Sequence, residues 1–295
     1  MKLIEQEWYD ILEKKILEFE PGHFWDNNRA WDADLKGKDT LVVAVGDSWT
    51  FGGGLLTDRL NQIYGRLVSN HYDADWLNVG GSGYSNTWIF DFANIIIENL
   101  KDSEYQKIIF LITMSEQGRD VATAKHCDLD YHQYESEGRI TEETFDRILS
   151  DIEDIYIEKL TTLLSNLDDR YSLVIGSGFT WHQKTMKWLE QQKISHPHNI
   201  IWTELLADKQ KLPRPPRTNL VYNFVFESNL PKLIEYCPKL DVPEWKSWMI
   251  QKMEVADQVH QFLQKSDLNF DIHPTPDGHR CWADEMIRIL DEAKN

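Results

Sequence analysis

The first stretch of the sequence that could do chemistry is GDSW, residues 46–49, which follows an apolar run. A serine such as Ser48 becomes a nucleophile only when a base lies within hydrogen-bond reach and donors can hold the oxyanion. The stretch lacks the G-x-S-x-G elbow that surrounds many nucleophilic serines. Asp47 and Ser48 would also suit a polar turn that caps the next segment, so both interpretations stay open here.

A second stretch, LNVGGSGYSN at 77–86, is rich in glycine directly after a predicted strand. Glycine lets the backbone approach a ligand closely, so Gly83 or Gly80 could supply an N–H group to an oxyanion. A tight strand-to-helix turn would need the same glycines. This stretch alone does not separate the two interpretations.

The third stretch is DIHPTPDGHRCWADEMI at 271–287, just before the end of the chain. His273 lies between an apolar residue and a proline and could act as a general base. Asp271, two residues earlier, could orient the imidazole as the acid of a serine triad does. A histidine in a loop often has no such role, and we interpret the nearby His279 as a packing or capping residue.

Regular elements must bring these three stretches together. Short apolar runs alternate with segments of helical period, which predicts a parallel sheet with helices on both faces. The predicted strands are 40–45, 74–80, 107–113, 171–178 and a fifth near 199–203. Since ligands bind beyond the carboxyl ends of such strands, we expect residues 46–48, 80–83 and 113–116 to meet at one edge.

Taken together and in this order, the three stretches resemble the SGNH hydrolases, also called the GDSL esterase/lipase superfamily. Ser48 matches the nucleophile of that family, Gly83 the oxyanion glycine and His273 the base. The resemblance covers residues 40–290 approximately and implies a flavodoxin-like three-layer α/β/α sandwich with a central parallel five-stranded sheet. It also implies ester hydrolysis by a Ser-His-Asp triad, without a metal or other cofactor.

The sequence departs from the family pattern after the third strand, where an oxyanion-donating asparagine is usual. Here the chain reads LITMSEQGRD, with Ser115 or Glu116 near the expected place. A serine hydroxyl could donate to an oxyanion, whereas an ionised glutamate would repel it. The chain is similar to a divergent branch, frequent in phage-like and bacterial proteins, in which Asn86 or Arg119 would take over positioning.

A second departure concerns the triad acid, which the family usually places three residues before the histidine. Phe270 occupies that position here, so we favour Asp271 and keep Asp267 as a weaker candidate. Asp277 lies further along and is interpreted as a cap for the final helix. Beside the nucleophile, Asp47 is included with Gly83, Ser115 and Asn86 among the residues expected to position the oxyanion or the substrate.

Composition limits the choice of substrate and partner. The 295 residues carry 31 Lys and Arg against 49 Asp and Glu, a net charge of −18. Such a charge repels nucleic acid and anionic lipid, so we expect neither nucleic acid nor a membrane as a partner. Without a signal peptide or an apolar run long enough to cross a membrane, a cytoplasmic protein is expected.

We therefore predict a serine esterase that acts on a small-molecule or glycan O-acyl ester. Tryptophans such as Trp49 and Trp88 could stack on a sugar ring, which favours a carbohydrate or glycoconjugate O-acetyl ester, although tryptophans also build cores. An acyltransferase on the same scaffold and a catalytically inactive glycan-binding module remain alternatives. The expected layout is an N-terminal helix and connector at 1–38, then one domain at 39–295 with insertions near 116–140 and 204–247.

Overall fold

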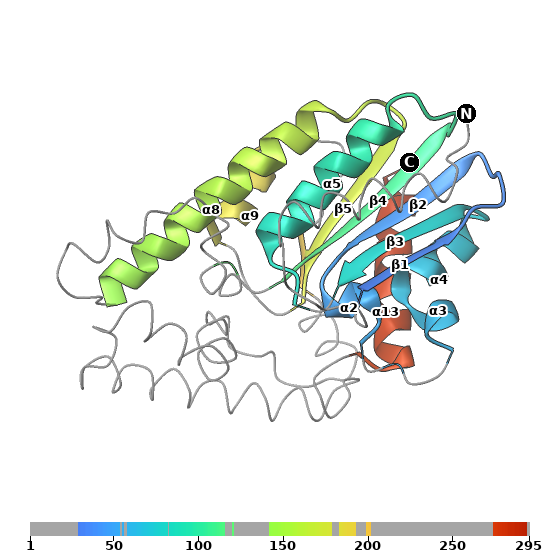
Figure 1. Cartoon of the computed structure of the whole chain (residues 1–295), viewed down its shortest axis with the longest axis horizontal. Helices are drawn as coiled ribbons and strands as arrows, with labels where there is room; N and C mark the ends of the chain where they lie inside the picture. Colours follow the sequence, from blue (N-terminus) through green and yellow to red (C-terminus); the bar gives the residue numbers. More distant parts are fainter. Residues whose placement is uncertain are drawn as a thin grey trace.

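The computed structural model describes residues 29–53, 55, 58–81, 83–115, 120, 142–178, 183–192, 199–201 and 274–293. Within these residues the chain forms one six-stranded sheet with helices on both faces (Figure 1). The strands are β1 (Arg29–Asp34), β2 (Thr40–Gly46), β3 (Asp75–Gly81), β4 (Lys107–Met114), β5 (Tyr171–Ser177) and β6 (Asn199–Ile201). Five of them lie where the apolar runs predict strands.

The strand order is β1-β3-β2-β4-β5-β6, and all neighbours are parallel except β1 and β3. Numbered along the chain, the five parallel strands have the order 2-1-3-4-5, which is the flavodoxin-like arrangement. The predicted fold class, a three-layer α/β/α sandwich with a central parallel five-stranded sheet, is therefore confirmed. The structure adds one antiparallel strand at the edge.

Successive side chains of the strands lie alternately in two hydrophobic cores, one on each face of the sheet. Leu41, Val43 and Val45 of β2 point into the core under α5 (Asn86–Leu100), α8 (Glu142–Ser165) and α9 (Gln183–Gln191). Val42 and Ala44 point to the other face, where α4 (Tyr64–His71) and α13 (Pro276–Glu292) pack, with α3 (Arg59–Gln62) beside them. Continuous apolar strands are expected where both faces are covered. None of the helices described here is long and apolar enough to cross a membrane.

The edge strand β1 was not predicted and lies in the segment interpreted as a connector. It pairs with β3 from Arg29 opposite Gly81 to Asp34 opposite Trp76. Its two aspartates form ion pairs with the helices on one face: Arg59 of α3 donates to Asp32 at 2.9 Å. Arg66 of α4 lies 2.5 Å from Asp34, and the Lys36 hydrogen bond and Arg66 hold the pKa of Asp34 below its usual value. Residues 29–34 thus belong to the sheet.

Of the other predicted segments, some lie among the described residues and some lie outside them. The expected N-terminal helix at 5–19 and the insertion at 204–247 lie outside the described residues, as does the insertion at 116–140 apart from Asp120. The helical period of residues 141–167 agrees with α8, and the predicted final helix corresponds to α13. The division into domains therefore stays a prediction.

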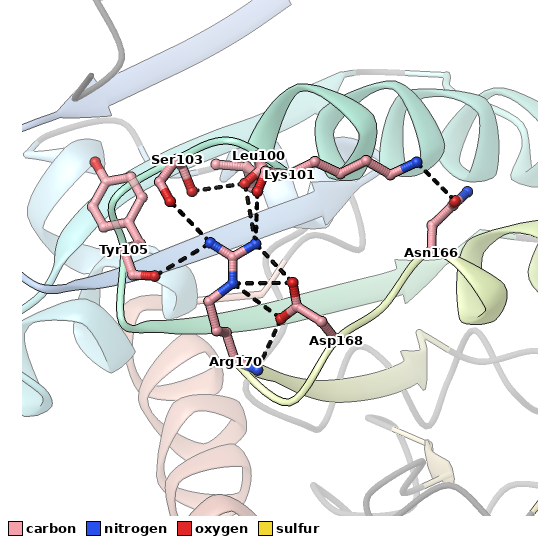
Figure 2. Close-up of polar contacts among 7 residues, drawn as sticks. All are labelled: Leu100, Lys101, Ser103, Tyr105, Asn166, Asp168 and Arg170. Carbon is pink, nitrogen blue, oxygen red and sulfur yellow. Dashed lines mark hydrogen bonds and ion pairs between the residues drawn. The ribbon is translucent and has the colours of Figure 1, made fainter.

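Arg170 joins the elements at the edge of the sheet where the parallel strands begin (Figure 2). Its guanidinium donates to the backbone oxygens of Leu100 and Lys101 at the end of α5, and of Ser103 at 2.9 Å. It also forms a two-pronged ion pair with Asp168, and these hydrogen bonds hold the pKa of that carboxyl below its usual value. The end of α5 is thereby tied to the start of β5.

Candidate functional site

The carboxyl ends of three neighbouring strands lie level with one another. Gly46 of β2 pairs with Gly80 of β3 on one side and with Thr113 of β4 on the other. We expected residues 46–48, 80–83 and 113–116 to meet at one edge, and this register confirms it for the strand ends Gly46, Gly80 and Thr113. The chain that follows β2 leads to α4 on one face of the sheet, whereas the chain that follows β4 leads to α8 on the opposite face. Such a divergence between adjacent strands is where open α/β sheets bind ligands.

Ser48 begins α2 (Ser48–Phe51), a single helical turn that directly follows β2 (Figure 1). Asp47 is its N-cap, since the Asp47 carboxylate accepts a hydrogen bond from the Trp49 N–H at 3.0 Å. Gly52 ends the turn in the left-handed region, with φ of 85°. The polar-turn interpretation is therefore correct for Asp47, whereas Ser48 is a helical residue and not a cap.

Two groups of Ser48 are not engaged by the neighbouring residues. Ser48 is 5% exposed, and within the described part of the chain neither its hydroxyl nor its backbone N–H takes part in a hydrogen bond. Its carbonyl accepts from Gly53 N at 2.8 Å, which closes the turn. A nucleophilic serine needs its hydroxyl for the base and its N–H for the oxyanion, and both are available here.

A chain of buried hydroxyl groups holds α2 against the sheet. Tyr64 OH lies 2.9 Å from Thr50 Oγ1 of α2 and 2.9 Å from Thr113 Oγ1 at the end of β4. Burial raises the pKa of the Tyr64 phenol well above its usual value, so this group stays protonated. Gly46 leaves room for the arrangement, because a Cβ atom there would lie 2.0 Å from Thr50 Oγ1.

The glycines after β3 have different reasons to be glycine. A Cβ atom on Gly80 would lie 2.4 Å from Phe51 N, so Gly80 allows β3 to pack against the backbone of α2. On Gly81 a Cβ atom would meet the Tyr84 ring at 2.2 Å. Gly83 is exposed, has φ of 82° and has no described atom within 4 Å of an added Cβ. Of the two oxyanion candidates, Gly83 is thus the one with open space beside it.

Asn86 links the start of α5 to the residue after β4. Its Oδ1 accepts from Ser115 N at 2.7 Å, and its Nδ2 donates to Ser115 O at 2.9 Å. The second hydrogen of Nδ2 points to Tyr156 OH, 3.3 Å away. Because both N–H donors of the amide are engaged, Asn86 acts on this edge through the backbone of Ser115. It does not present a donor of its own.

Sequence reasoning missed Asp120. This residue lies within the segment expected to be an insertion, near 116–140, and no motif in the sequence distinguishes it from the other acidic residues there. In the structure it is fully buried and accepts from the backbone N–H groups of Asn86 at 3.1 Å and Thr87 at 3.2 Å. The Tyr156 hydroxyl donates to the same carboxylate. Burial raises the pKa of Asp120, although the hydrogen bonds from Tyr156 and Thr87 act in the opposite direction.

The residues expected to act as base and acid precede α13. His273, Asp271 and the weaker candidate Asp267 lie outside the described residues, as do Glu116 and Arg119. Helix α13 has Thr275 as its N-cap, and Asp277 lies in its first turn, not at the cap position predicted for it.

The first turns of α13 pack against Tyr64, next to α2. The buried His279 ring stacks 6.2 Å from the ring of Tyr64, the residue that hydrogen-bonds to α2. This agrees with the prediction that His279 is a packing residue. The first turns of α13 are therefore connected to α2, the helix that begins at Ser48, through the side chain of Tyr64.

The tryptophans expected to meet a sugar are differently placed. Trp49 is 3% exposed and packs in the core with α4 and α13, so it cannot stack on a ligand as the sequence suggested. Trp88 in the first turn of α5 is partly buried and contacts the Tyr84 ring edge-on. As for metals, the described residues contain no group of three or more histidine, cysteine or acidic side chains that could hold an ion.

Comparisons with known proteins give only distant likenesses. No protein-family model matches the sequence, and no curated protein matches it. A solved structure of a member of the lipolytic protein G-D-S-L family from Veillonella parvula DSM 2008 has 11% identity and a TM-score of 0.37, covering 85% of this chain and 98% of that one. The lipase Lip_vut3 from a goat rumen metagenome has 19% identity and a TM-score of 0.38, covering 58% and 85%. Both are too distant to carry a conclusion about family or activity.

Proposed function

We propose that the protein is a serine hydrolase that cleaves O-acyl esters, with Ser48 as its nucleophile. One observation carries the proposal: Ser48 follows β2 at the divergence between β2 and β4, with its hydroxyl and N–H unused among the described residues. Ligands bind at this position in sheets of this topology. The order of Ser48, Gly83 and His273 along the chain, which resembles the SGNH hydrolases, supports the same assignment.

In the proposed mechanism His273 takes the proton of the Ser48 hydroxyl, and Oγ attacks the acyl carbonyl carbon. The N–H groups of Ser48 and Gly83 and the hydroxyl of Ser115 hold the oxyanion. His273, oriented by Asp271, then protonates the leaving alcohol and afterwards activates the water that releases the acid. No metal or other cofactor takes part in these steps.

The substrate that we propose is a short-chain ester of a polar alcohol, such as a carbohydrate O-acetyl ester. Polar residues follow the strands at this edge, with Asp47 and Ser48 after β2 and Ser115 after β4. Trp88, partly buried at the start of α5, is the tryptophan that could still meet a sugar ring. Trp49 no longer supports this substrate class because its side chain lies in the core.

Covalent labelling by a fluorophosphonate tests the proposal directly. The wild-type protein should be labelled at Ser48, and Ser48→Ala should lose both the label and the hydrolysis of p-nitrophenyl acetate. Ser177→Ala is the matched control, because Ser177 is also a buried serine at the carboxyl end of a parallel strand. An unlabelled wild-type protein that binds glycans saturably would contradict the proposal in favour of a binding module. Ester products formed only with an added acceptor alcohol would indicate an acyltransferase.

A further inference from the structure

A buried polar network joins the segment that follows β3 to the segment that follows β4. Its members are Asp120, Asn86, Ser115 and Tyr156, and we call it the Asp120 network. All four residues are 3% exposed or less. Tyr156 comes from the middle of α8, so the network also ties both segments to the helix layer on one face of the sheet. None of its contacts depends on exposed side chains.

On the β3 side, the network fixes where α5 begins. The Asp120 carboxylate accepts the N–H groups of Asn86 and Thr87, which are the first two residues of the helix. These N–H groups have no partner inside a helix, and a carboxylate satisfies them while also favouring the helix dipole. Gly83 lies only three residues before Asn86, so an anchored first turn also restrains the backbone of Gly83.

On the β4 side, the network fixes the backbone of Ser115. The Asn86 amide pairs with both the N–H and the C=O of Ser115, as a neighbouring strand would. It thus continues the hydrogen bonding of β4 beyond Met114, the last residue of the strand. With its backbone held at both polar groups, Ser115 has a fixed main-chain position from which its side chain projects.

We propose that Asp120 and Tyr156 are positioning residues of the esterase site, which set the spacing between the Gly83 N–H and the Ser115 hydroxyl. This inference rests on the proposed function, in which those two groups hold the oxyanion. Oxyanion donors act only when they lie at hydrogen-bond distance from the developing charge. A displacement of about 1 Å in such a site lowers the rate by roughly 100-fold.

Two conservative substitutions test the proposal. Asp120→Asn keeps the side-chain size but turns an acceptor oxygen into an NH₂ group, which would face one of the donors now bound there. We expect kcat for p-nitrophenyl acetate to fall by roughly 100-fold, with KM changed less than about twofold. Tyr156→Phe removes one donor and leaves the carboxylate with both backbone N–H groups, so we expect a smaller fall, of roughly tenfold.

Asp91→Asn is the matched control. Asp91 also links α5 to α8, through Lys159 Nζ at 2.6 Å, but it lies more than one helical turn further along α5 than Asn86. We expect it to lower Tm while kcat stays within about twofold of wild type. All variants are assayed well below their own Tm, so that a loss of folded protein does not enter kcat.

The possible results separate this inference from the proposed function. A fall in kcat for Asp120→Asn and Tyr156→Phe, without a matching fall for Asp91→Asn, supports the positioning role. If the wild type is active and all three variants keep its kcat, or if all three lose it equally, the inference is wrong while the esterase proposal stands. If the wild type neither hydrolyses esters nor is labelled at Ser48, the proposed function fails, and this inference fails with it.

Discussion

Ser48 owes its position to the two residues that cap its short helical turn. Asp47 binds the Trp49 N–H at the start of α2, and Gly52 closes the end with φ of 85°. A Cβ atom at Gly52 would lie 2.3 Å from Ile63 Cγ2, so another side chain would be both strained and crowded there. The Ser48 hydroxyl is therefore placed by its neighbours' contacts with the backbone and needs no hydrogen bond of its own within the described residues.

The cap gives a first prediction. Replacing Asp47 by alanine should lower the free energy of unfolding by about 1 kcal/mol, because the Trp49 N–H loses its acceptor. The labelling of Ser48 by a fluorophosphonate should slow at the same time, since α2 is no longer held at its start. Asp47→Asn keeps an acceptor oxygen and should preserve most of both quantities. If asparagine and alanine behave alike in urea denaturation and in labelling, the carboxylate charge matters rather than the cap.

The glycines of this edge give a second prediction. Gly46→Ala should lower the free energy of unfolding by roughly 3 kcal/mol, because the new methyl group would meet Thr50 and the Thr113 carbonyl oxygen, 2.9 Å away. Gly83→Ala should lower the free energy of unfolding by only about 1–2 kcal/mol. The backbone there is already left-handed, so the added Cβ atom is strained, but it meets no described atom. Chemical denaturation of the two variants compares them, and the reverse order would contradict this packing.

At the scale of elements, the phenol of Tyr64 links the short helix α2 to its surroundings. Tyr64, the first residue of α4, connects Thr50 of α2 with Thr113 of β4. The same ring packs against His279 and edge-on against Trp282, both of α13. The elements α2, α4, β4 and α13 therefore meet around this side chain, and the proposed catalytic geometry depends on how they pack together.

Tyr64→Phe is the third prediction. Loss of the hydroxyl leaves two buried threonine hydroxyls without their shared partner, which should lower the free energy of unfolding by about 1–3 kcal/mol. Because α2 loses its link to β4, kcat should also fall, by roughly tenfold or more. Both quantities are measured on the same preparation, by denaturation and by steady-state kinetics.

Tyr105→Phe is the control for that experiment. Tyr105 OH donates to the buried Asp75 at 3.0 Å, near the other edge of the sheet. Its loss should reduce stability by a similar amount and leave kcat near the wild-type value. Equal loss of kcat in the two variants would show that the hydrogen bond from Tyr64 to α2 contributes no more to the rate than a buried phenol elsewhere in the fold.

At the scale of the whole molecule, the two ends of the parallel strands differ in the residues that gather there. The carboxyl edge holds the candidate site, whereas the opposite edge holds Arg170 and its carbonyl partners (Figure 2). Arg170 contributes a charge-assisted set of hydrogen bonds that no lysine could reproduce, because several planar donors point to separate oxygens. Stability and catalysis should therefore be separable by mutation.

Arg170→Gln is the fourth prediction, and it includes a dependence on pH. At pH 7 the free energy of unfolding should fall by roughly 1–3 kcal/mol, with kcat unchanged. Since Arg170 lowers the folded-state pKa of Asp168, that carboxyl stabilises the fold above its ordinary pKa of 3.8 and loses this contribution as the pH falls through the lower folded value. The gap between wild type and variant should accordingly be smaller at pH 3 than at pH 7 in urea denaturation.

The control for Arg170→Gln is Arg288→Gln. Arg288 is half-exposed on α13 and pairs with Glu285 and Glu292 on the same helix. Surface pairs of this kind contribute less than about 1 kcal/mol, so this substitution should change stability little. A loss as large as that of Arg170→Gln would mean that the carbonyl contacts at the end of α5 are not what stabilises this edge.

Much of the fold could be predicted because buried parallel strands leave a clear pattern in the sequence. Runs such as TLVVAV at 40–45 and KIIFLIT at 107–113 are apolar on both faces. Each forms a strand that ends one residue beyond the run. The strand β1 could not be found in this way. Its sequence RAWDAD carries aspartates whose cationic partners, Arg59 and Arg66, lie on helices far along the chain. These ion pairs form only in the folded protein, so no local sequence pattern predicts that residues 29–34 are a strand.

The candidate site could be predicted in part for the same reason. Ser48, Gly83 and Ser115 follow strand ends, and the parallel register aligns those ends without any knowledge of side chains. The role of Asn86 was less accessible, since its amide is engaged by a backbone 29 residues away. Asp120 becomes visible only when Tyr156 and the start of α5 are placed around it.

The antiparallel strand β1 also has a consequence for the behaviour of the protein at high concentration. Without it, β3 would be the outer strand, and its fully buried backbone and side chains would be exposed to pairing with another chain. Because β1 is short and its aspartates are tied to arginines on the adjacent helices, it offers a poor template for adding a further strand. We therefore expect the six residues 29–34 to disfavour self-association through this side of the sheet.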